Sequence, residues 1–299
     1  MYKQLQKAVA IVGPTAAGKT RLGITIAQKF NGEIVSADSR QVYKYLDICT
    51  GKDKEEYGKI PYHLIDILEL DQEITVADFQ KKAFAAIDEI LKKDKLPVVV
   101  GGSPFYVYSV TEGWEFPRFN KDEKLRKKLN KLSLLELQNI LQKIDPSAFA
   151  KIDQNNPRRL IRAIEVCTLS GKDFENSKPV SKPRYDFLFL GIKFSNKELK
   201  ERIQTRLKQR LDEGMIGEIE NIVKKKQASH ADLQRLGLEP RFISYYLQKK
   251  INKEQVEDLL LKNIYHFAKR QMTWFSKDER IVWVKNTNKA IEYVKNFLD

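Results

Sequence analysis

The segment GPTAAGKT, residues 13–20, has the residue types and spacing of a phosphate-binding loop. It satisfies the pattern G-x-x-x-x-G-K-[ST] in full and directly follows the apolar run KAVAIV. In such a loop, backbone N–H groups converge on an anion at a helix N-terminus, the lysine adds a positive charge, and the final hydroxyl can hold Mg²⁺. We predict that this phosphate loop uses Gly13, Pro14, Thr15, Ala16, Ala17, Gly18, Lys19 and Thr20, with Thr20 as the ligand of a Mg²⁺ cofactor.

A carboxylate follows the next predicted strand. Asp38 lies in GEIVSADS, residues 32–39, just beyond the apolar part of the run. An aspartate at a strand end near a phosphate loop is well placed to take a proton from an acceptor, although it could equally cap a helix or turn. Kinases usually place a metal-holding acid after another apolar strand. Here LPVVVGGS, residues 96–103, ends in two glycines and a serine instead.

The elements around these residues predict the fold. Short apolar runs alternate with helical patterns over the first hundred residues, and near-continuous apolar runs are typical of strands buried on both sides of a parallel sheet. The order strand, loop, helix at the phosphate loop agrees with this interpretation. We therefore predict an α/β protein with a P-loop-type parallel-sheet core and helices on both faces.

The pattern changes after Gly113. Residues 121–144 and 156–172 predict amphipathic helices, with Asn155 or Asn156 as a cap of the second, and a strand pattern returns at YDFLFLGIKF, residues 185–194. The sequence thus predicts an inserted all-helical domain at 115–183. The catalytic core would comprise 1–114 and 184–299, with long helices toward the C-terminus.

The net charge of +14 lies entirely in the second part of the chain. Residues 1–113 contain 15 Lys and Arg and 15 Asp and Glu, so the excess belongs to residues 114–299. A neutral first part and a cationic remainder favour a polyanionic partner, most commonly nucleic acid.

Cys49 and Cys167 have neither metal-ligand nor disulfide-framework spacing, which fits a reducing compartment. We expect a cytoplasmic monomer that makes no use of a membrane.

Six segments together resemble the tRNA dimethylallyltransferases, also called tRNA isopentenyltransferases. They are GPTAAGKT, IVSADSRQVYKYLDICTGK, YHLIDI, VVVGGSPFY, NNPRRLIRAIEV and KRQMTWF, in the order of that family and over nearly the whole chain. The resemblance implies transfer of a dimethylallyl group from dimethylallyl diphosphate to N6 of the adenine 3′-adjacent to the anticodon. It also implies that the phosphate loop holds a diphosphate and that the partner is a tRNA anticodon stem-loop.

The resemblance implies roles for individual residues. Asp38 matches the general base, Ser103 keeps a hydroxyl near the acceptor amine, and Arg202 and Arg206 match two donor-binding arginines. Without the resemblance, the arginine row at 202, 206 and 210 would indicate a solvated basic helix face. The implied catalytic residues are Asp38, Ser103, Lys19 and Arg206. The implied tRNA contacts are Asp38, Ser39, Arg40, Gln41, Ser103, Arg158, Arg159, Arg162, Arg241, Lys269, Arg270, Gln271 and Trp274.

Several positions leave alternatives open. Trp274 could equally be a core residue, and His63 and Asp66 are expected to be structural. The family commonly has Gly-Gly-Thr-Gly-Leu-Tyr where this sequence has Gly-Gly-Ser-Pro-Phe-Tyr at 101–106, and Pro240 and Ser276 also depart from its pattern. These changes could alter channel shape or tRNA preference. Three other functions remain: a small-molecule kinase, an isopentenyltransferase that acts on free adenine nucleotides, or a non-catalytic RNA-binding protein, for which the intact phosphate loop and Asp38 would be superfluous.

Overall fold

The computed structural model describes residues 5–116, 122–175 and 179–299. The chain forms two compact units, one of residues 1–112 with 183–299 and the other of residues 113–182. The first unit contains the sheet, and the described part of the second contains helices joined by turns, with one isolated β-bridge between Glu115 and Val180.

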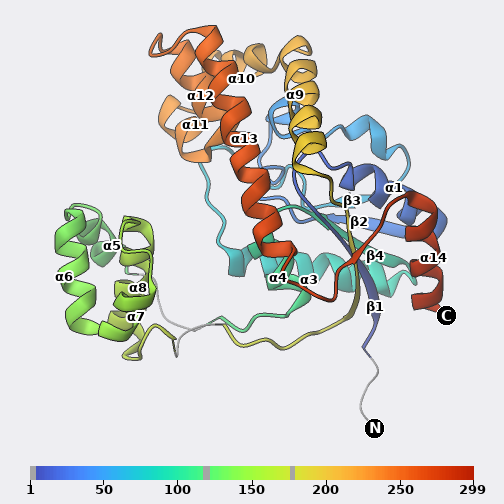
Figure 1. Cartoon of the computed structure of the whole chain (residues 1–299), viewed down its shortest axis with the longest axis horizontal. Helices are drawn as coiled ribbons and strands as arrows, with labels where there is room; N and C mark the ends of the chain where they lie inside the picture. Colours follow the sequence, from blue (N-terminus) through green and yellow to red (C-terminus); the bar gives the residue numbers. More distant parts are fainter. Residues whose placement is uncertain (1–4, 117–121, 176–178) are drawn as a thin grey trace. The chain divides into compact units, whose positions relative to one another are not determined.

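The first unit is built on a six-stranded sheet in the order β3-β2-β4-β1-β5-β6, and all of its strand pairs are parallel. Figure 1 shows its strands side by side. The parallel sheet confirms the predicted α/β class. Loops that follow parallel strands leave the same edge of the sheet, so the segments after β1, β2 and β4 lie together. The strands are β1 Lys7–Val12, β2 Gly32–Ser36, β3 Tyr62–His63, β4 Leu96–Gly101, β5 Asp186–Gly191 and β6 Val282–Trp283.

Helices cover the sheet on both faces. Side chains alternate along each strand, so Val9, Ile11, Val98 and Val100 form one buried cluster with residues of helices α1 (Lys19–Lys29) and α14 (Thr287–Leu298). Helices α3 (Val76–Lys92) and α4 (Pro104–Thr111) pack on each other and on β4. Phe79 of α3 stacks on Tyr106 of α4 with ring centroids 3.9 Å apart.

The C-terminal half of this unit adds a group of helices to the sheet. Two of them matter most for the site. Helix α9 (Asn196–Asp212) has a buried row formed by Leu199, Ile203 and Leu207. Helix α13 (Lys253–Phe275) buries Ile264, Ala268 and Gln271 among others. None of the described helices is both long and apolar enough to cross a membrane. The remaining helices of this unit are α2 Asp47–Thr50, the 3₁₀ helix η1 Lys54–Tyr57, α10 Met215–Lys224, α11 His230–Leu236 and α12 Leu238–Leu247.

The second unit has a small apolar core of its own. Leu137 and Leu141 pack with Leu160 and Ile164, and all four side chains are buried. The Asn156 side chain accepts a hydrogen bond from the N–H of Arg159 at 3.3 Å, which shows that Asn156 rather than Asn155 caps the predicted helix. The helices are α5 Glu123–Leu129, α6 Leu134–Ile144, α7 Pro146–Lys151 and α8 Pro157–Ser170.

Candidate active site

The phosphate loop leaves β1 through a turn that requires glycine. Gly13 has φ 146°, and a Cβ at this position would lie 2.5 Å from the backbone oxygen of Ile192. Gly18 has φ 86° and directly precedes α1, so the loop amides lead into a helix N-terminus. The Lys19 ammonium donates to the backbone oxygen of Pro14 at 2.7 Å, which holds it across the loop.

One pocket contains residues of all the segments expected to carry chemistry. Lys19 and Thr20 of the phosphate loop, Asp38 after β2, and Arg206 of α9 line it together. The pocket thus brings a phosphate-binding loop and a carboxylate within one enclosed space. Its other lining residues are Thr15, Ser36, Gln41, Thr50, Tyr57, Val100, Gly101 and Gln271.

The segment of residues 37–41, called here the Asp38 loop, is held by one hydrogen bond within the loop and two to Ser103. The N–H of Arg40 donates to Oδ1 of Asp38 at 2.8 Å. The N–H of Ser39 donates to Oγ of Ser103 at 3.1 Å, and the Ser103 hydroxyl donates to Oγ of Ser39 at 3.2 Å. Ser103 is buried at the first turn of α4, where Pro104 occupies a position that needs no N–H. Ser103 therefore braces the loop that carries Asp38.

The arginine row of α9 runs from an exposed Arg202 to a buried Arg210, and all three side chains contact residues of the site. Arg202 donates from Nε to the backbone oxygen of Ala16 at 2.9 Å. Arg206 lies 3.7 Å from a carboxylate oxygen of Asp53, and the guanidinium groups of Arg206 and Arg210 pack against Gly51, where a Cβ would overlap them. This environment favours the donor-binding role of Arg206 over that of a solvated basic helix face.

The electrostatics of the site favour an anion. Burial lowers the pKa of Lys19 to about 8, with Arg206 adding to the shift and Asp38 opposing it. Burial, with the neighbouring Arg210, lowers the pKa of Arg206 to about 10. Burial likewise raises the pKa of the Glu239 carboxyl, which lies near both arginines. Positive charge crowded into a buried space is stabilised when an anion enters.

Comparison with known proteins identifies the family. Residues 41–278 match the family model described as IPP transferase. The chain belongs to the IPP transferase family. A tRNA dimethylallyltransferase 2 of Shewanella sediminis is 42% identical over 273 residues, which cover 91% of this chain and 89% of that protein. A tRNA dimethylallyltransferase of Finegoldia magna is 41% identical over 287 residues, 93% of this chain and 91% of that protein.

Solved structures agree with this membership. The chain matches the tRNA isopentenylpyrophosphate transferase of Bacillus halodurans with a TM-score of 0.72 and 34% identity, covering 98% of this chain and 95% of that one. A eukaryotic dimethylallyltransferase described as acting on tRNA has a TM-score of 0.83 at 24% identity, covering 98% and 79%, and shows the fold alone. The family expected from the six segments is confirmed, and its members are transferases.

Two glutamines expected to contact tRNA, Gln41 and Gln271, form hydrogen bonds within this IPP transferase family member. Oε1 of Gln41 accepts from the Ser36 hydroxyl at 2.9 Å, and its Nε2 donates to the backbone oxygen of Gly51 at 3.0 Å. Gln271 is 2% exposed and bonds to two backbone groups. The amide of Gln41 thus ties the Asp38 loop to Ser36 and Gly51, because burial requires its polar atoms to find partners. Gln41 also lines the pocket, and its contact with an adenine edge stays a prediction.

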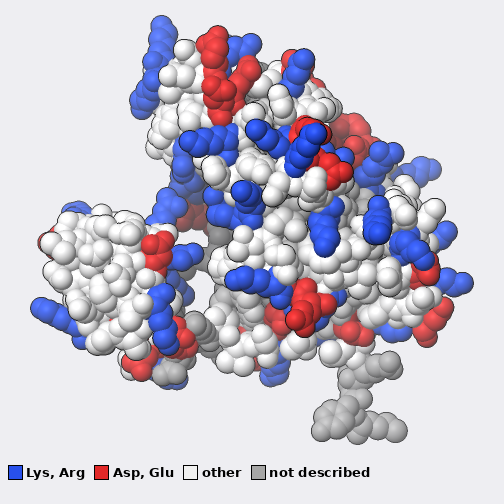
Figure 2. Space-filling view, in the orientation of Figure 1, with Lys and Arg blue, Asp and Glu red and all other residues white. Residues whose placement is uncertain are grey.

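Several other expected RNA contacts are more accessible. Lys269 and Arg270 are exposed on α13, and Trp274 is 44% exposed, with its ring centroid 5.1 Å from that of Phe105. Trp274 is therefore not a fully buried core residue. Figure 2 shows Lys and Arg side chains over this part of the molecule, with Asp and Glu among them. Arg241 donates from Nε to the backbone oxygen of Gln234 at 2.9 Å.

In the second unit, α8 carries three further predicted contacts. Arg158, Arg159 and Arg162 are all exposed, while Leu160 and Ile161 between them are buried. Within its own unit, α8 thus presents cations on one face and packs the other into the core.

Sequence reasoning missed several residues that line the site. Thr50 and Tyr57 reach the pocket from α2 and η1, which have too few residues to show periodicity. Arg210 lies beside Arg206 at Gly51 and not in the lining of this pocket, and its spacing in the arginine row was a usable signal for that position. By contrast, the expectation for His63 and Asp66 agrees with the contacts: His63 lies 2.8 Å from Glu33, and Asp66 pairs with the fully buried Lys52.

A metal at this site would depend on the ligand for most of its coordination. Within the described ranges, no group of three or more His, Cys, Asp or Glu side chains could hold an ion. Thr20 offers a hydroxyl to the same pocket as Lys19. Mg²⁺ commonly binds through one or two protein ligands, waters and substrate phosphates, so the residues present fit such an ion.

Proposed function

We propose that this protein transfers a dimethylallyl group from dimethylallyl diphosphate to N6 of the adenine 3′-adjacent to the anticodon of a tRNA, with release of diphosphate. The observation that carries the proposal is the single pocket lined by Lys19, Thr20, Asp38 and Arg206. A diphosphate site and a carboxylate that can accept a proton are the two requirements of such a transfer. The names of the curated relatives support the same activity.

The phosphate loop and α9 would bind the donor. Backbone N–H groups leading into α1, the Lys19 ammonium and the Arg206 guanidinium would surround the diphosphate and stabilise the charge that grows on it as it leaves. Thr20 would hold Mg²⁺ together with phosphate oxygens, and a bound Mg²⁺ would help to neutralise the leaving group.

Asp38 would act on the acceptor. The lone pair of adenine N6 is delocalised into the ring, so N6 is a weak nucleophile, while positive charge on the allylic carbon is shared over the double bond. As N6 bonds to that carbon and the carbon–oxygen bond to diphosphate breaks, the Asp38 carboxylate takes the N6 proton. Ser39 and Ser103 hold the Asp38 loop in place through their mutual hydrogen bonds.

The tRNA would be bound by surfaces outside this pocket. A base stacked in an RNA loop has to be extruded before its amine can be reached. Exposed Lys269 and Arg270 on α13, and the three arginines of α8, have the character of phosphate contacts, and Trp274 offers a face for base stacking. We expect the protein to act as a monomer in the cytoplasm.

The direct test is to incubate the protein with tRNA, dimethylallyl diphosphate and Mg²⁺ and to analyse the nucleosides by mass. We expect one adenosine per substrate tRNA to gain the mass of a dimethylallyl group in place of a hydrogen. The Asp38→Asn variant should lose transfer by roughly 10²- to 10⁴-fold, as expected for a general base, and still bind tRNA. Phosphate transfer from ATP would favour a small-molecule kinase. Prenylation of free AMP but not tRNA would favour an isopentenyltransferase that acts on free nucleotides.

A further inference from the structure

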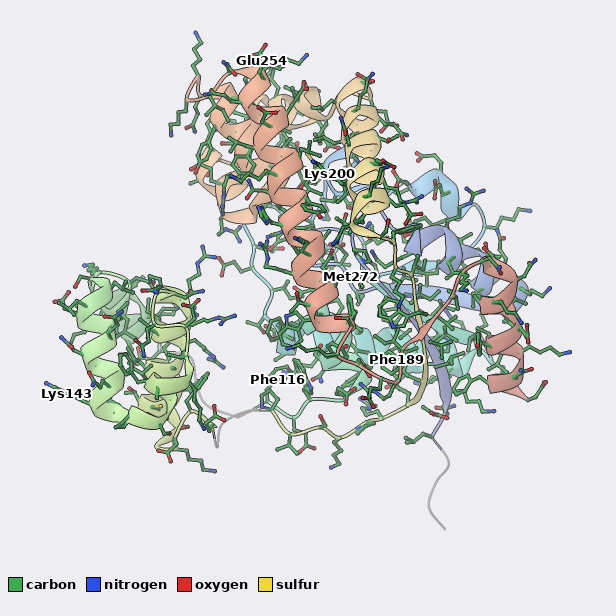
Figure 3. The ribbon with its side chains drawn as sticks, viewed as in Figure 1. Phe116, Lys143, Phe189, Lys200, Glu254 and Met272 are labelled. Carbon is green, nitrogen blue, oxygen red and sulfur yellow. The ribbon has the colours of Figure 1, made fainter. Side chains whose placement is uncertain are left out.

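Gln271 connects two loops that the sequence keeps far apart. Its Oε1 accepts from the backbone N–H of Thr15 in the phosphate loop at 2.8 Å, and its Nε2 donates to the backbone oxygen of Gly102 at 2.6 Å. The side chain comes from α13, and the neighbouring Met272 marks this part of the helix in Figure 3. One buried amide therefore joins the segment after β1 to the segment after β4.

The junction has no spare room. A Cβ at Gly102 would lie 2.4 Å from Nε2 of Gln271 and 3.3 Å from both Nζ of Lys19 and the backbone oxygen of Gly13. A side chain at position 102 would thus displace the Gln271 amide and crowd both Lys19 and the phosphate loop. The amide oxygen of Gln271 meets a backbone N–H, and its amide nitrogen meets a backbone carbonyl oxygen. The side chain is therefore held in one orientation.

The contacts continue from Gly102 to the carboxylate. Gly102 is followed by Ser103, whose hydroxyl bonds to Ser39, and Ser39 is the neighbour of Asp38. Thr15, at the other end, is part of the loop that would hold the diphosphate. A continuous set of hydrogen bonds and adjacent residues therefore runs from the donor side of the pocket to the acceptor side, and Gln271 joins the phosphate loop to the rest of it.

We infer that Gln271 is a positioning residue that sets the separation between the phosphate loop and the segment that braces Asp38. The inference rests on the proposed function, because this separation affects a reaction rate only if the phosphate loop holds the donor and Asp38 acts on the acceptor. It is a role additional to the RNA contact expected for Gln271, because the two bonds use one N–H and one acceptor site of the amide. Displacement of reacting groups by about 1 Å can cost roughly 100-fold in rate.

The first variant removes both hydrogen bonds while keeping the length of the side chain. In Gln271→Met we expect the single-turnover rate at saturating tRNA and dimethylallyl diphosphate to fall roughly 10- to 100-fold. Saturating tRNA keeps any loss of tRNA affinity out of this rate. Thr273→Ala is the matched control, because Thr273 is exposed on the same helix and its hydroxyl bonds only to the Lys269 carbonyl of its own helix in the contacts described. It should keep the wild-type rate.

The second variant gives a readout that a general packing defect would not produce. Gln271→Glu keeps an acceptor for the Thr15 N–H, but an ionised carboxylate cannot donate to Gly102, whereas a protonated one can. We expect the ratio of its rate to the wild-type rate to rise as the pH is lowered. The same ratio for Gln271→Met should stay flat, which separates this effect from the titration of Asp38.

A wild-type rate in Gln271→Met, or weaker tRNA binding with the rate preserved, would overturn the inference. Should Gln271→Met fail to fold, a flat pH ratio for Gln271→Glu would overturn it equally. Absence of transfer by the wild-type protein itself would contradict the proposed function instead, so the two failures are distinguishable.

Discussion

Helices α8 and α9 carry the same arginine spacing in different surroundings. In α8, Arg158 and Arg162 lie four residues apart and are exposed. In α9, Arg202, Arg206 and Arg210 also lie four residues apart, and Arg202 is exposed, yet Arg206 is half-buried and Arg210 is 9% exposed. Each row occupies one side of its helix, as a four-residue spacing requires.

The difference lies in what each row faces. The α9 row meets the phosphate loop at Ala16, the α2 carbonyl of Cys49, and Gly51, which has no side chain to exclude the guanidinium groups. The α8 row lies on the outside of a helix whose opposite face fills the core of its own unit. Spacing therefore predicts that arginines act together. Only the three-dimensional surroundings decide whether they serve a small buried anion or an extended exposed one.

Among variants of the two arginine rows, the largest expected effect comes from removing the charge of the half-buried Arg206. Arg206→Gln should raise the KM for dimethylallyl diphosphate roughly 10- to 100-fold, because a hydrogen bond to a charged group contributes about 1.5–3 kcal/mol. Steady-state kinetics at varied donor and saturating tRNA would measure it. The affinity for tRNA should be unaffected.

Arg206→Lys is the matched control for charge alone. Lysine retains a positive charge but lacks the planar fork of the guanidinium, so this variant should recover only part of the donor affinity. An unchanged donor KM in Arg206→Gln would show that burial beside the phosphate loop does not distinguish α9 from α8.

The core of the fold could be predicted from the sequence because its signals are local. The runs at β1 and β4 are apolar almost throughout, which is how strands buried on both sides look, and the phosphate loop has its own pattern. In β2 the signal is shorter, because only Ile34 and Val35 lie between the polar Glu33 and Ser36. The two-residue strands β3 and β6 have no such signal. Their pairing depends on neighbouring strands of the sheet, so it could not be predicted from their own residues.

A second prediction concerns the pH dependence of donor binding. In the free protein the pKa of Lys19 is lowered from 10.5 to about 8, so its charge is lost as the pH rises through that value. A bound diphosphate stabilises the ammonium and raises the pKa again. Donor binding should therefore take up a proton above pH 8 and weaken by up to about tenfold per pH unit toward pH 10.

Calorimetric titration of dimethylallyl diphosphate, without tRNA and in buffers of different ionisation enthalpy, would measure this uptake. Lys19→Arg is the control, since arginine stays charged throughout the range. The sign for folding is opposite: the unfolded chain holds this proton more tightly, so the donor-free protein should gain stability as the pH rises from 8 toward 10.5. Donor affinity that stays level from pH 7 to 10 would contradict the prediction.

The site residues that belong to sequence motifs could be predicted. Contacts between residues far apart in the chain could not. Lys19, Thr20, Asp38 and Arg206 were expected from motifs, and the structure places all four around one pocket. Gln271 was expected at the RNA, because sequence shows an amide beside Lys269 and Arg270 but not which side of α13 it occupies relative to Thr15. That contact spans 256 positions of the chain, and no local pattern encodes it.

The smallest expected effects belong to the exposed row. Arg158→Gln, Arg159→Gln and Arg162→Gln should each weaken tRNA binding a few-fold and reduce the slope of log affinity against log salt by roughly 1, as the loss of one phosphate contact predicts. Because the replaced side chains are exposed, the stability of each variant should stay within about 0.5 kcal/mol of wild type. The KM for dimethylallyl diphosphate should not change.

Lys143→Gln offers the matched control for this last prediction. Lys143 is an exposed cation on α6 of the same unit, labelled in Figure 3, and its replacement removes the same charge without touching α8. If the slope falls equally in Lys143→Gln, the unit attracts RNA only by its overall charge. If it falls in none of the variants, the exposed arginines are a solvated helix face, and the contrast between α8 and α9 is one of burial alone.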